Sequence, residues 1–291
     1  MTVREAINKA LNETGRTAEE MLAAEVLLAF CLNVTREDLF IRHDLKVSEA
    51  DANKFFEILE RFYLGEPVAY LTGSKEFYGF DFCVNKNVLI PRPETELLVE
   101  EVLKLVPDRE TVKILDVGTG SGCIAVALAK HLKCAELTAT DISSGALTVA
   151  RKNAERHGVS SRIRFINTDL IDNVRGPFDI VVANLPYIGE KKYNFVSREA
   201  KKYEPHVALF GGVDGLRLYE KLFEHLAGRK WKPRFLLGEF GFLQGDEMRG
   251  LLNEYFAGWQ CAILKDYASI ERIFVVAFSP LHTSRRRVWL K

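Results

Sequence analysis

The chain has 291 residues, of which 47% are hydrophobic and 27% charged, and forty lysine and arginine residues balance forty aspartate and glutamate residues. This length allows one large domain or two ordinary ones with buried cores, and the hydrophobic content excludes a disordered protein. No apolar run approaches the roughly 20 residues that cross a bilayer, so we expect no membrane-spanning segment. The balanced charge disfavours stable binding of nucleic acid, because contacts to phosphates need an excess of positive side chains.

The first residues, MTVREAINKALNETG, contain no apolar core of a secretory signal, so we expect a cytoplasmic protein. The five cysteines are odd in number, widely spaced and form no CxxC pair. This pattern predicts reduced thiols rather than disulfides, and no metal site. The sequence contains no indication of an oligomeric state.

Residues 1–75 show apolar side chains at the three- and four-residue spacing of packed helices, as in the run from Val3 to Leu11. Thr17, followed three residues later by Glu20, is typical of a helix start, and Ser48 begins a similar pattern. The segment has thirteen acidic and nine basic residues. We therefore expect a small acidic helical bundle that contacts a protein or acts as a lid, rather than one that binds nucleic acid.

Residues 76–90 are rich in aromatic and β-branched side chains and are interrupted by glycine, which predicts a β-hairpin linking two domains. From residue 91 to 280, apolar strands alternate with helices. The expected strands are 112–118, 136–141, 163–169, 178–184, 234–240 and 272–278. This alternation predicts an α/β fold with a doubly wound, mostly parallel sheet covered on both faces. The basic segment 281–291 is expected to be a solvated tail.

A glycine-rich loop follows the first of these strands and opens a helix, with the sequence Gly118, Thr119, Gly120, Ser121, Gly122. It matches neither GxGxxG nor a P-loop, but its glycines allow a backbone to approach a ligand closely. Asp141 ends the next strand and Asp169 the third, both at the carboxyl edge where ligands bind. Asp141 is placed to accept the two hydroxyls of a ribose. Each aspartate alone is equally typical of a helix N-cap.

An apolar strand runs into Asn184, Leu185, Pro186 and Tyr187. The plain interpretation is a turn that ends the strand. The functional interpretation is a clamp for a planar NH2 group. The Asn184 side-chain oxygen and the Leu185 carbonyl would accept its two hydrogens, and the exposed Tyr187 ring would cover one face. Such a clamp would orient a weakly nucleophilic nitrogen towards a methyl donor without a metal or a covalent nucleophile.

These residues resemble the class I S-adenosylmethionine-dependent methyltransferases, with their Rossmann-like fold, and more narrowly the HemK/PrmC family. The resemblance rests on GEPVAYLTGSKEFYGFDFCVNKNVLIPRPETELLVE (65–100), ILDVGTGSGCIAVALA (114–129) and YEPHVALFGGVDGL (203–216). Members of that family methylate the side-chain nitrogen (N5) of the glutamine in the GGQ motif of peptide chain release factors. The resemblance therefore implies a protein methylation enzyme of translation termination, with S-adenosylmethionine as cofactor and release factors as partners. It also implies that the helical segment 1–75 recognises the protein substrate.

The resemblance also implies roles for individual positions. The loop Gly118–Gly122 would surround the methionine part of the cofactor, Asp141 would hold the ribose, and Asp169 and Leu170 would border the adenine. Asn184 would act beside both cofactor and substrate, and Asn184 to Tyr187 would bind the glutamine amide, with Asn184 and Tyr187 as the catalytic residues. Pro91, Arg92 and Glu94 would lie near the cofactor or substrate, or Arg92 and Glu94 would form part of a structural ion pair.

Two positions depart from the family pattern, Leu185 and Leu170, and Leu170 stands where some family members carry an aromatic residue. The usual motif is NPPY, and Leu185 replaces its first proline, so the rigidity of that proline is lost. The resulting NLPY is also the form seen in ribosomal RNA adenine dimethyltransferases. The alternative function is therefore methylation of adenine N6, or of another exocyclic amine, in RNA or DNA.

Overall fold

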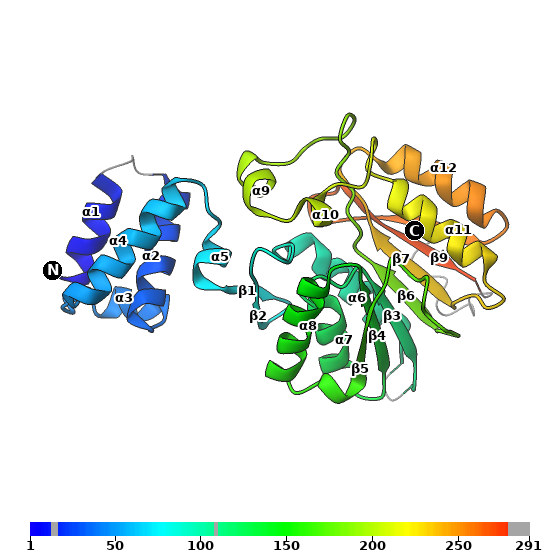
Figure 1. The fold of residues 1–291 in the computed structure, drawn as a ribbon, viewed down its shortest axis with the longest axis horizontal. Coiled ribbons are helices and arrows are strands. Elements are labelled where there is room, and N and C mark those ends of the chain that lie inside the picture. The colour runs from blue at the N-terminus through cyan, green and yellow to red at the C-terminus, as the bar shows by residue number, and fades with distance from the viewer. Residues whose placement is uncertain (13–16, 108–109, 279–291) are drawn as a thin grey trace. The chain divides into compact units, whose positions relative to one another are not determined.

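The computed structural model describes residues 1–12, 17–107 and 110–278, and the expected basic tail 281–291 lies outside these ranges. The chain divides into two compact units, Met1–Ser74 and Lys75–Lys291. Each unit has a hydrophobic core of its own, the first between helices and the second around a large sheet (Figure 1).

The first unit is a helical bundle. Its helices are α1 (Val3–Asn12), α2 (Ala18–Leu32), α3 (Arg36–Ile41), α4 (Glu49–Tyr63) and α5 (Val68–Thr72). Thr17 and Glu20 form a capping box at the start of α2, and Ser48 Oγ accepts the backbone N–H of the first turn of α4. Leu27 and Phe55 are fully buried where the helices meet. The expected helical bundle is therefore confirmed.

A two-stranded hairpin follows, formed by β1 (Ser74–Phe77) and β2 (Phe80–Cys83). Its two turn residues, Tyr78 and Gly79, both have positive φ angles, as a type I′ turn requires. Phe77 and Phe82 are buried in the core that lies on one face of the large sheet. These two rings anchor the hairpin to the second unit.

The second unit contains a seven-stranded sheet with the order β5-β4-β3-β6-β7-β9-β8. Its strands are β3 (Lys113–Val117), β4 (Glu136–Asp141), β5 (Ile163–Asn167), β6 (Ile180–Ala183), β7 (Phe235–Glu239), β8 (Gln260–Lys265) and β9 (Glu271–Ala277). All neighbouring strands are parallel except β9, which is antiparallel to both β7 and β8. The order reverses between β3 and β6, and ligands bind beside such a reversal in open α/β sheets.

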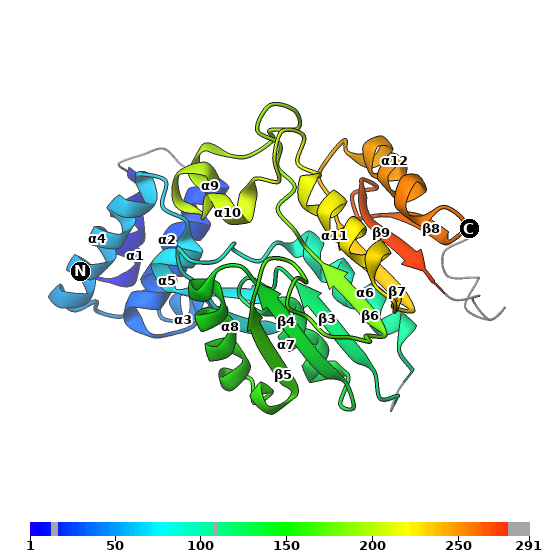
Figure 2. The ribbon, with the colours of Figure 1, turned by 45° about the vertical axis from the view of Figure 1, so that its right-hand side comes forward.

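Helices cover both faces of the sheet (Figures 1 and 2). Because successive strand residues point to opposite faces, Ile114 of β3 packs in the core with α6 and α7, and Leu115 in the core with α11 and α12. The helices of this unit are η1 (Pro93–Thr95), α6 (Glu96–Leu105), α7 (Cys123–His131), α8 (Ser144–Arg156), η2 (Ser160–Arg162), α9 (Arg198–Tyr203), α10 (His206–Leu209), α11 (Arg217–Gly228) and α12 (Gly245–Phe256). The doubly wound, mostly parallel sheet is confirmed.

β5 ends at Asn167, two residues earlier than the sequence pattern predicts, and β3, β6, β7 and β9 each end one residue earlier. The Asn167 side-chain amide donates to the carbonyls of Asp141 and Ile142, each at 2.9 Å, and the chain turns three residues later at Leu170, whose φ is 44°. The pattern also misses β8, an edge strand whose side chains are all partly or fully exposed. Over the part of the chain that the structure describes, every helix is too short or too polar to traverse a bilayer.

Candidate active site

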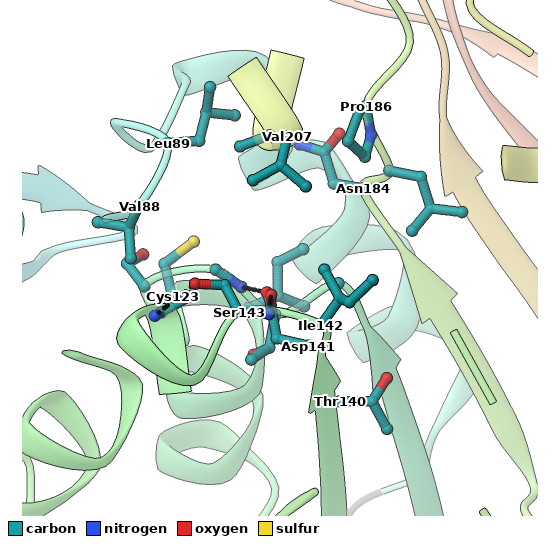
Figure 3. Close-up of a pocket in the computed structure, with 18 of the residues that line it drawn as sticks. Val88, Leu89, Cys123, Thr140, Asp141, Ile142, Ser143, Asn184, Pro186 and Val207 are labelled. Atoms are coloured by element: carbon teal, nitrogen blue, oxygen red, sulfur yellow. Dashed lines mark hydrogen bonds between the residues drawn. The ribbon is translucent and has the colours of Figure 1, made fainter. Parts of the chain in front are cut away.

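A cavity of about 220 Å³ opens at the carboxyl edge of the sheet. Its walls come from the loops after β3, β4 and β6 and from residues 87–92, 169–170 and 207–208. Figure 3 shows Asp141 and Asn184 across the cavity from each other, with Val88 and Leu89 on a further side. The reversal of strand order therefore brings together side chains that are far apart in the sequence.

The glycine-rich loop is fastened to the end of β4 through its backbone. The N–H groups of Gly118 and Thr119 both donate to the carbonyl of Thr140, at 2.9 and 2.8 Å. Gly118 has a φ of 74°, and a Cβ on it would lie 2.9 Å from Cδ2 of Leu185. Glycine is therefore needed here both for the left-handed backbone and for the close approach of residue 185. The loop residues that line the cavity are Gly118, Thr119, Gly120 and Ser121.

Gly122, the fifth loop residue expected at the cofactor, is not among the residues that line the cavity. It is the N-cap of α7 with a φ of 80°, and a Cβ on it would lie 3.0 Å from Cβ of Ala150 in α8. Gly122 therefore permits the tight packing of two helices, which fixes the shape of the loop.

Asp141 ends β4 and presents its carboxylate to the cavity (Figure 3). Oδ2 accepts the N–H of Gly120 at 2.9 Å, and Oδ1 accepts the N–H of Ser143 at 2.8 Å. Burial raises the pKa of Asp141 above its ordinary value, while the two N–H donors favour the ionised form. Each oxygen retains a second lone pair, which suits the two adjacent hydroxyls of a ribose.

Asp169 and Leu170 lie beyond the end of β5, and both line the cavity. Asp169 Oδ2 accepts from Lys221 Nζ of α11 at 2.5 Å, which leaves Oδ1 as the acceptor for a ligand. The Leu170 side chain is buried in the core beneath α11 and α12 and contributes apolar surface to this wall.

Asn184 directly follows β6, and its side chain lies at the cavity wall (Figure 3). Its Nδ2 donates to Thr95 Oγ1 at 2.8 Å, and Thr95 Oγ1 donates in turn to Glu239 Oε2 at 2.7 Å. Glu239 ends the neighbouring strand β7 and is 0% exposed, and this burial raises the pKa of its carboxyl group. A chain of hydrogen bonds therefore runs from the buried carboxylate to the cavity.

Leu185 and Pro186 continue the same wall. The Leu185 side chain is 2% exposed, and its backbone N–H donates to the Tyr219 hydroxyl at 3.3 Å. A proline at position 185 would have no N–H for this bond. The structure thus brings Asn184, Leu185 and Pro186 together at the cavity.

Tyr187 is only partly exposed, contrary to the sequence expectation, and is not among the residues that line the cavity. Its hydroxyl donates to Glu239 Oε1 at 2.9 Å. Burial and the neighbouring Glu239 raise the pKa of Tyr187 well above its ordinary value, so the phenol stays neutral. Its carbonyl accepts from Gln244 Nε2 at 2.8 Å, which holds the backbone of this loop.

The segment IPRPET contributes Pro91, Arg92 and Thr95 to the cavity, whereas Glu94 is exposed and is not part of the wall. An Arg92 NH group donates to Glu204 Oε1 at 2.5 Å, and Glu204 is buried. The structural ion pair therefore exists, but its acid is Glu204 rather than Glu94, whose side chain lies in solvent.

Thr95 and Tyr219 are functional candidates that the sequence pattern does not indicate. Thr95 lies 89 positions before its partner Asn184, and Tyr219 lies 34 positions after Leu185. Thr95 is the last residue of the IPRPET motif, so the motif could have pointed to it. Tyr219 has the helical spacing of an ordinary core residue in α11, so the sequence offers no signal for it.

The cavity suits S-adenosylmethionine. Thr140 is among the residues that line it, and its Oγ1 is buried without a hydrogen-bond partner among the described residues, so it is available to pair with a polar ligand atom. Asp141 can hold the ribose hydroxyls, and Ile142 and Leu170 provide apolar surface for a purine.

Comparison with known families matches both units. Residues 2–73 match the family model of the PrmC N-terminal domain, and residues 93–201 match that of the methyltransferase small domain.

Several similar proteins are named release factor glutamine methyltransferase. The release factor glutamine methyltransferase of Koribacter versatilis is 39% identical over 94% of this chain and 98% of its own length. That of Nitratidesulfovibrio vulgaris is 40% identical over 86% of each chain. A bifunctional methyltransferase of Rickettsia typhi is 36% identical over 98% of this chain and 58% of its own.

Solved structures support the fold alone, because their sequences are distant. A methyltransferase from Pyrococcus furiosus has a TM-score of 0.52 at 18% identity and covers 76% of this chain and 98% of its own. The hMettl16 catalytic domain, in complex with the MAT2A 3'UTR hairpin 6, has a TM-score of 0.56 at 14% identity, covering 82% of this chain and 85% of its own. Both show that the chain shares its fold with methyltransferases of known structure.

Proposed function

The chain belongs to the release factor glutamine methyltransferase family, and we propose that it transfers a methyl group from S-adenosylmethionine to the side-chain nitrogen (N5) of the glutamine in the GGQ motif of peptide chain release factors. The observation that carries this proposal is a single cavity that joins Asp141, suited to a ribose, with the acceptor pair of Asn184 and Leu185. S-adenosylmethionine supplies an electrophilic methyl group on a sulfonium.

On the cofactor side, the loop Gly118–Ser121 would surround the methionine part, with Gly122 shaping the loop from behind. Asp141 would bind the ribose through the lone pairs that its backbone donors leave free. Asp169 Oδ1 and the apolar surface of Leu170 would border the adenine.

On the acceptor side, the Asn184 side-chain oxygen and the Leu185 carbonyl would each accept one hydrogen of the glutamine NH2. An amide nitrogen is a poor nucleophile because its lone pair is delocalised. The two acceptors would hold it in line with the donor methyl group and would stabilise the positive charge that develops on nitrogen until one proton passes to solvent. Pro186 would shape this loop, and Tyr187, anchored on Glu239, would pack beside the amide.

The first unit would recognise the release factor, and the enzyme would act in the cytoplasm, where release factors are used. The domain limits 1–75, 76–90 and 91–280 belong to this proposal. Its support is the match of residues 2–73 to a domain model that carries the name of this family.

Transfer of tritium from labelled S-adenosylmethionine to a purified release factor tests the proposal. Label should appear in the wild-type factor and be absent from a factor whose GGQ glutamine is replaced by alanine. Asn184→Ala should lower the transfer rate by about 100-fold or more, with the cofactor dissociation constant changed by less than about threefold.

Two results would contradict the proposal. Label that persists in the alanine factor would move the modified site away from the GGQ glutamine. Label that enters bulk RNA or DNA instead would favour the exocyclic-amine alternative, which the NLPY sequence motivates.

A further inference from the structure

Glu239 is a fully buried carboxylate with two hydroxyl donors at the acceptor wall. Oε2 accepts from Thr95 Oγ1 at 2.7 Å and Oε1 from the Tyr187 hydroxyl at 2.9 Å. The same Thr95 oxygen lies 2.8 Å from Nδ2 of Asn184. Glu239 itself is 0% exposed, so Thr95 links a buried anion to a side chain at the cavity.

The chemistry of Glu239, Thr95 and Asn184 decides which group donates and which accepts in each hydrogen bond between them. Although burial raises the pKa of Glu239, its two hydroxyl donors and the nearby Arg272 favour the ionised form, which can only accept hydrogen bonds. A threonine hydroxyl has a single hydrogen to donate. Thr95 therefore gives its hydrogen to Glu239, and its oxygen must accept from the next partner. Of the two ends of the Asn184 amide, only the NH2 end can donate, so this end faces Thr95.

We propose that Thr95 and Glu239 are positioning residues that hold the Asn184 amide with its oxygen, rather than its NH2 group, turned to the glutamine. This inference rests on the proposed role of Asn184 as an acceptor. A flipped amide would oppose one NH2 group with another, which loses a hydrogen bond and leaves two donors unpaired at a partly buried site. We call the two hydrogen bonds from Asn184 to Thr95 and from Thr95 to Glu239 the relay. The relay selects the catalytic rotamer of Asn184 before the substrate arrives.

The first test compares two substitutions of Thr95 in the full-length enzyme. Thr95→Val keeps the shape but removes the hydroxyl, so the turnover number should fall at least about tenfold. The Michaelis constant for S-adenosylmethionine should change by less than about twofold. Thr95→Ser keeps the hydroxyl and should recover most of the lost rate. Thr148→Val removes an exposed hydroxyl that donates to the carbonyl of Ser144 in α8, and should leave the rate unchanged.

A second test separates orientation from support of the fold. Aspartate has two equivalent oxygens and no wrong end to present. Thr95→Val should therefore reduce the rate of the Asn184→Asp enzyme by a much smaller factor than it reduces the wild-type rate. Equal factors in the two backgrounds would overturn the relay, as would a Thr95→Ser enzyme that is as slow as Thr95→Val.

These outcomes are distinguishable from failure of the proposed function. If the wild-type enzyme does not label the GGQ glutamine, the proposed function fails. If it does, and the rate responds to Asn184→Ala but not to Thr95→Val, the clamp stands and the relay is wrong.

Discussion

Leu185 shows how one replaced residue can be compensated by its surroundings. The sequence predicts that the loop loses the rigidity of a proline at this position. The structure instead provides a hydrogen bond that proline cannot make, from the Leu185 N–H to the buried Tyr219 hydroxyl at 3.3 Å. This hydroxyl also lies 3.1 Å from the carbonyl of Ala183 and close to that of Glu239, so it can donate to the strands while accepting from the loop.

Tyr219→Phe should therefore lower the free energy of unfolding by about 1–3 kcal/mol, because it leaves buried backbone groups without partners. Urea unfolding of the cofactor-free protein measures this cost. In a Leu185→Pro background the N–H is already absent, so the same change should cost less, by about 1 kcal/mol. Tyr267→Phe, at a side chain that is 83% exposed, is the control and should cost less than about 0.5 kcal/mol. If the costs of Tyr219→Phe and Leu185→Pro in unfolding free energy simply add in the double variant, Tyr219 does not support Leu185.

Asp116 is a second residue whose environment has a measurable consequence. It is 0% exposed, Oδ2 accepts from the Thr119 hydroxyl, and Oδ1 has no partner among the described residues. Burial raises the pKa of Asp116 to about 7, with a further contribution from the nearby Asp141. The native state therefore holds a proton that the unfolded chain releases near pH 4.

The stability that this proton provides is fully present below about pH 4 and is lost as the pH rises through about 7. Asp116→Asn cannot ionise and still accepts from Thr119. It should be more stable than the wild type at pH 8 by about 2–4 kcal/mol, and the difference should vanish towards pH 4. Chemical unfolding of both proteins without cofactor, at pH 4.5, 6 and 8, gives the difference directly. A difference that does not change with pH would show that Asp116 does not titrate in this range.

At the scale of elements, central strands such as β6 and β7 can be predicted because each is a mostly apolar run that is buried on both faces. The edge strand β8 carries partly exposed side chains without such a run, so its sequence does not distinguish it from a loop. Strand ends are also less predictable, because they depend on side-chain bonds to a neighbour. Asn167, for example, is the last residue of β5, and its side-chain amide donates to two carbonyls at the end of β4 where the strand stops.

The candidate site, like the strands, can be predicted only in part from the sequence. Residues that follow strands directly, such as Asp141 and Asn184, can be found because the carboxyl edge of a parallel sheet binds ligands. The bonds that link Asn184 to Thr95 and Thr95 to Glu239 cannot, because these residues are far apart in the sequence and meet only in the folded sheet. Arg92 and Glu204 are likewise 112 positions apart, which is why the nearer Glu94 was the wrong partner.

At the scale of the whole molecule, the balanced net charge conceals two oppositely charged parts. Residues 1–75 have thirteen acidic and nine basic residues, and the rest of the chain has the complementary excess of basic residues. Every residue that lines the cavity, from Asn87 to Leu218, belongs to the second unit. Cofactor binding and chemistry should therefore depend on the second unit, and the proposed recognition of a basic partner surface should depend on the acidic first unit.

A chain that begins at Ser74 should separate these two tasks. It retains the hairpin, whose Phe77 and Phe82 anchor it in the second core, and the complete cavity wall. Its dissociation constant for S-adenosylmethionine should stay within about threefold of the full-length value. Its Michaelis constant for a whole release factor should rise at least about tenfold, because a stable protein contact needs about 800 Å² on each partner, more than one glutamine pocket provides.

A short peptide that carries GGQ is the matched control for the shortened chain. The peptide can reach the cavity but offers no extended surface, so both chains should methylate it at similar rates if the first unit serves only recognition. Isothermal titration of the cofactor and steady-state rates with peptide and whole factor give the three comparisons. If cofactor affinity and the rates with peptide and whole factor all fall equally in the shortened chain, the first unit supports the fold of the second. If the shortened chain methylates the whole factor at an unchanged rate, recognition of the factor belongs to the second unit. The basic excess and the cavity of that unit would then suffice to bind the factor without the acidic helices.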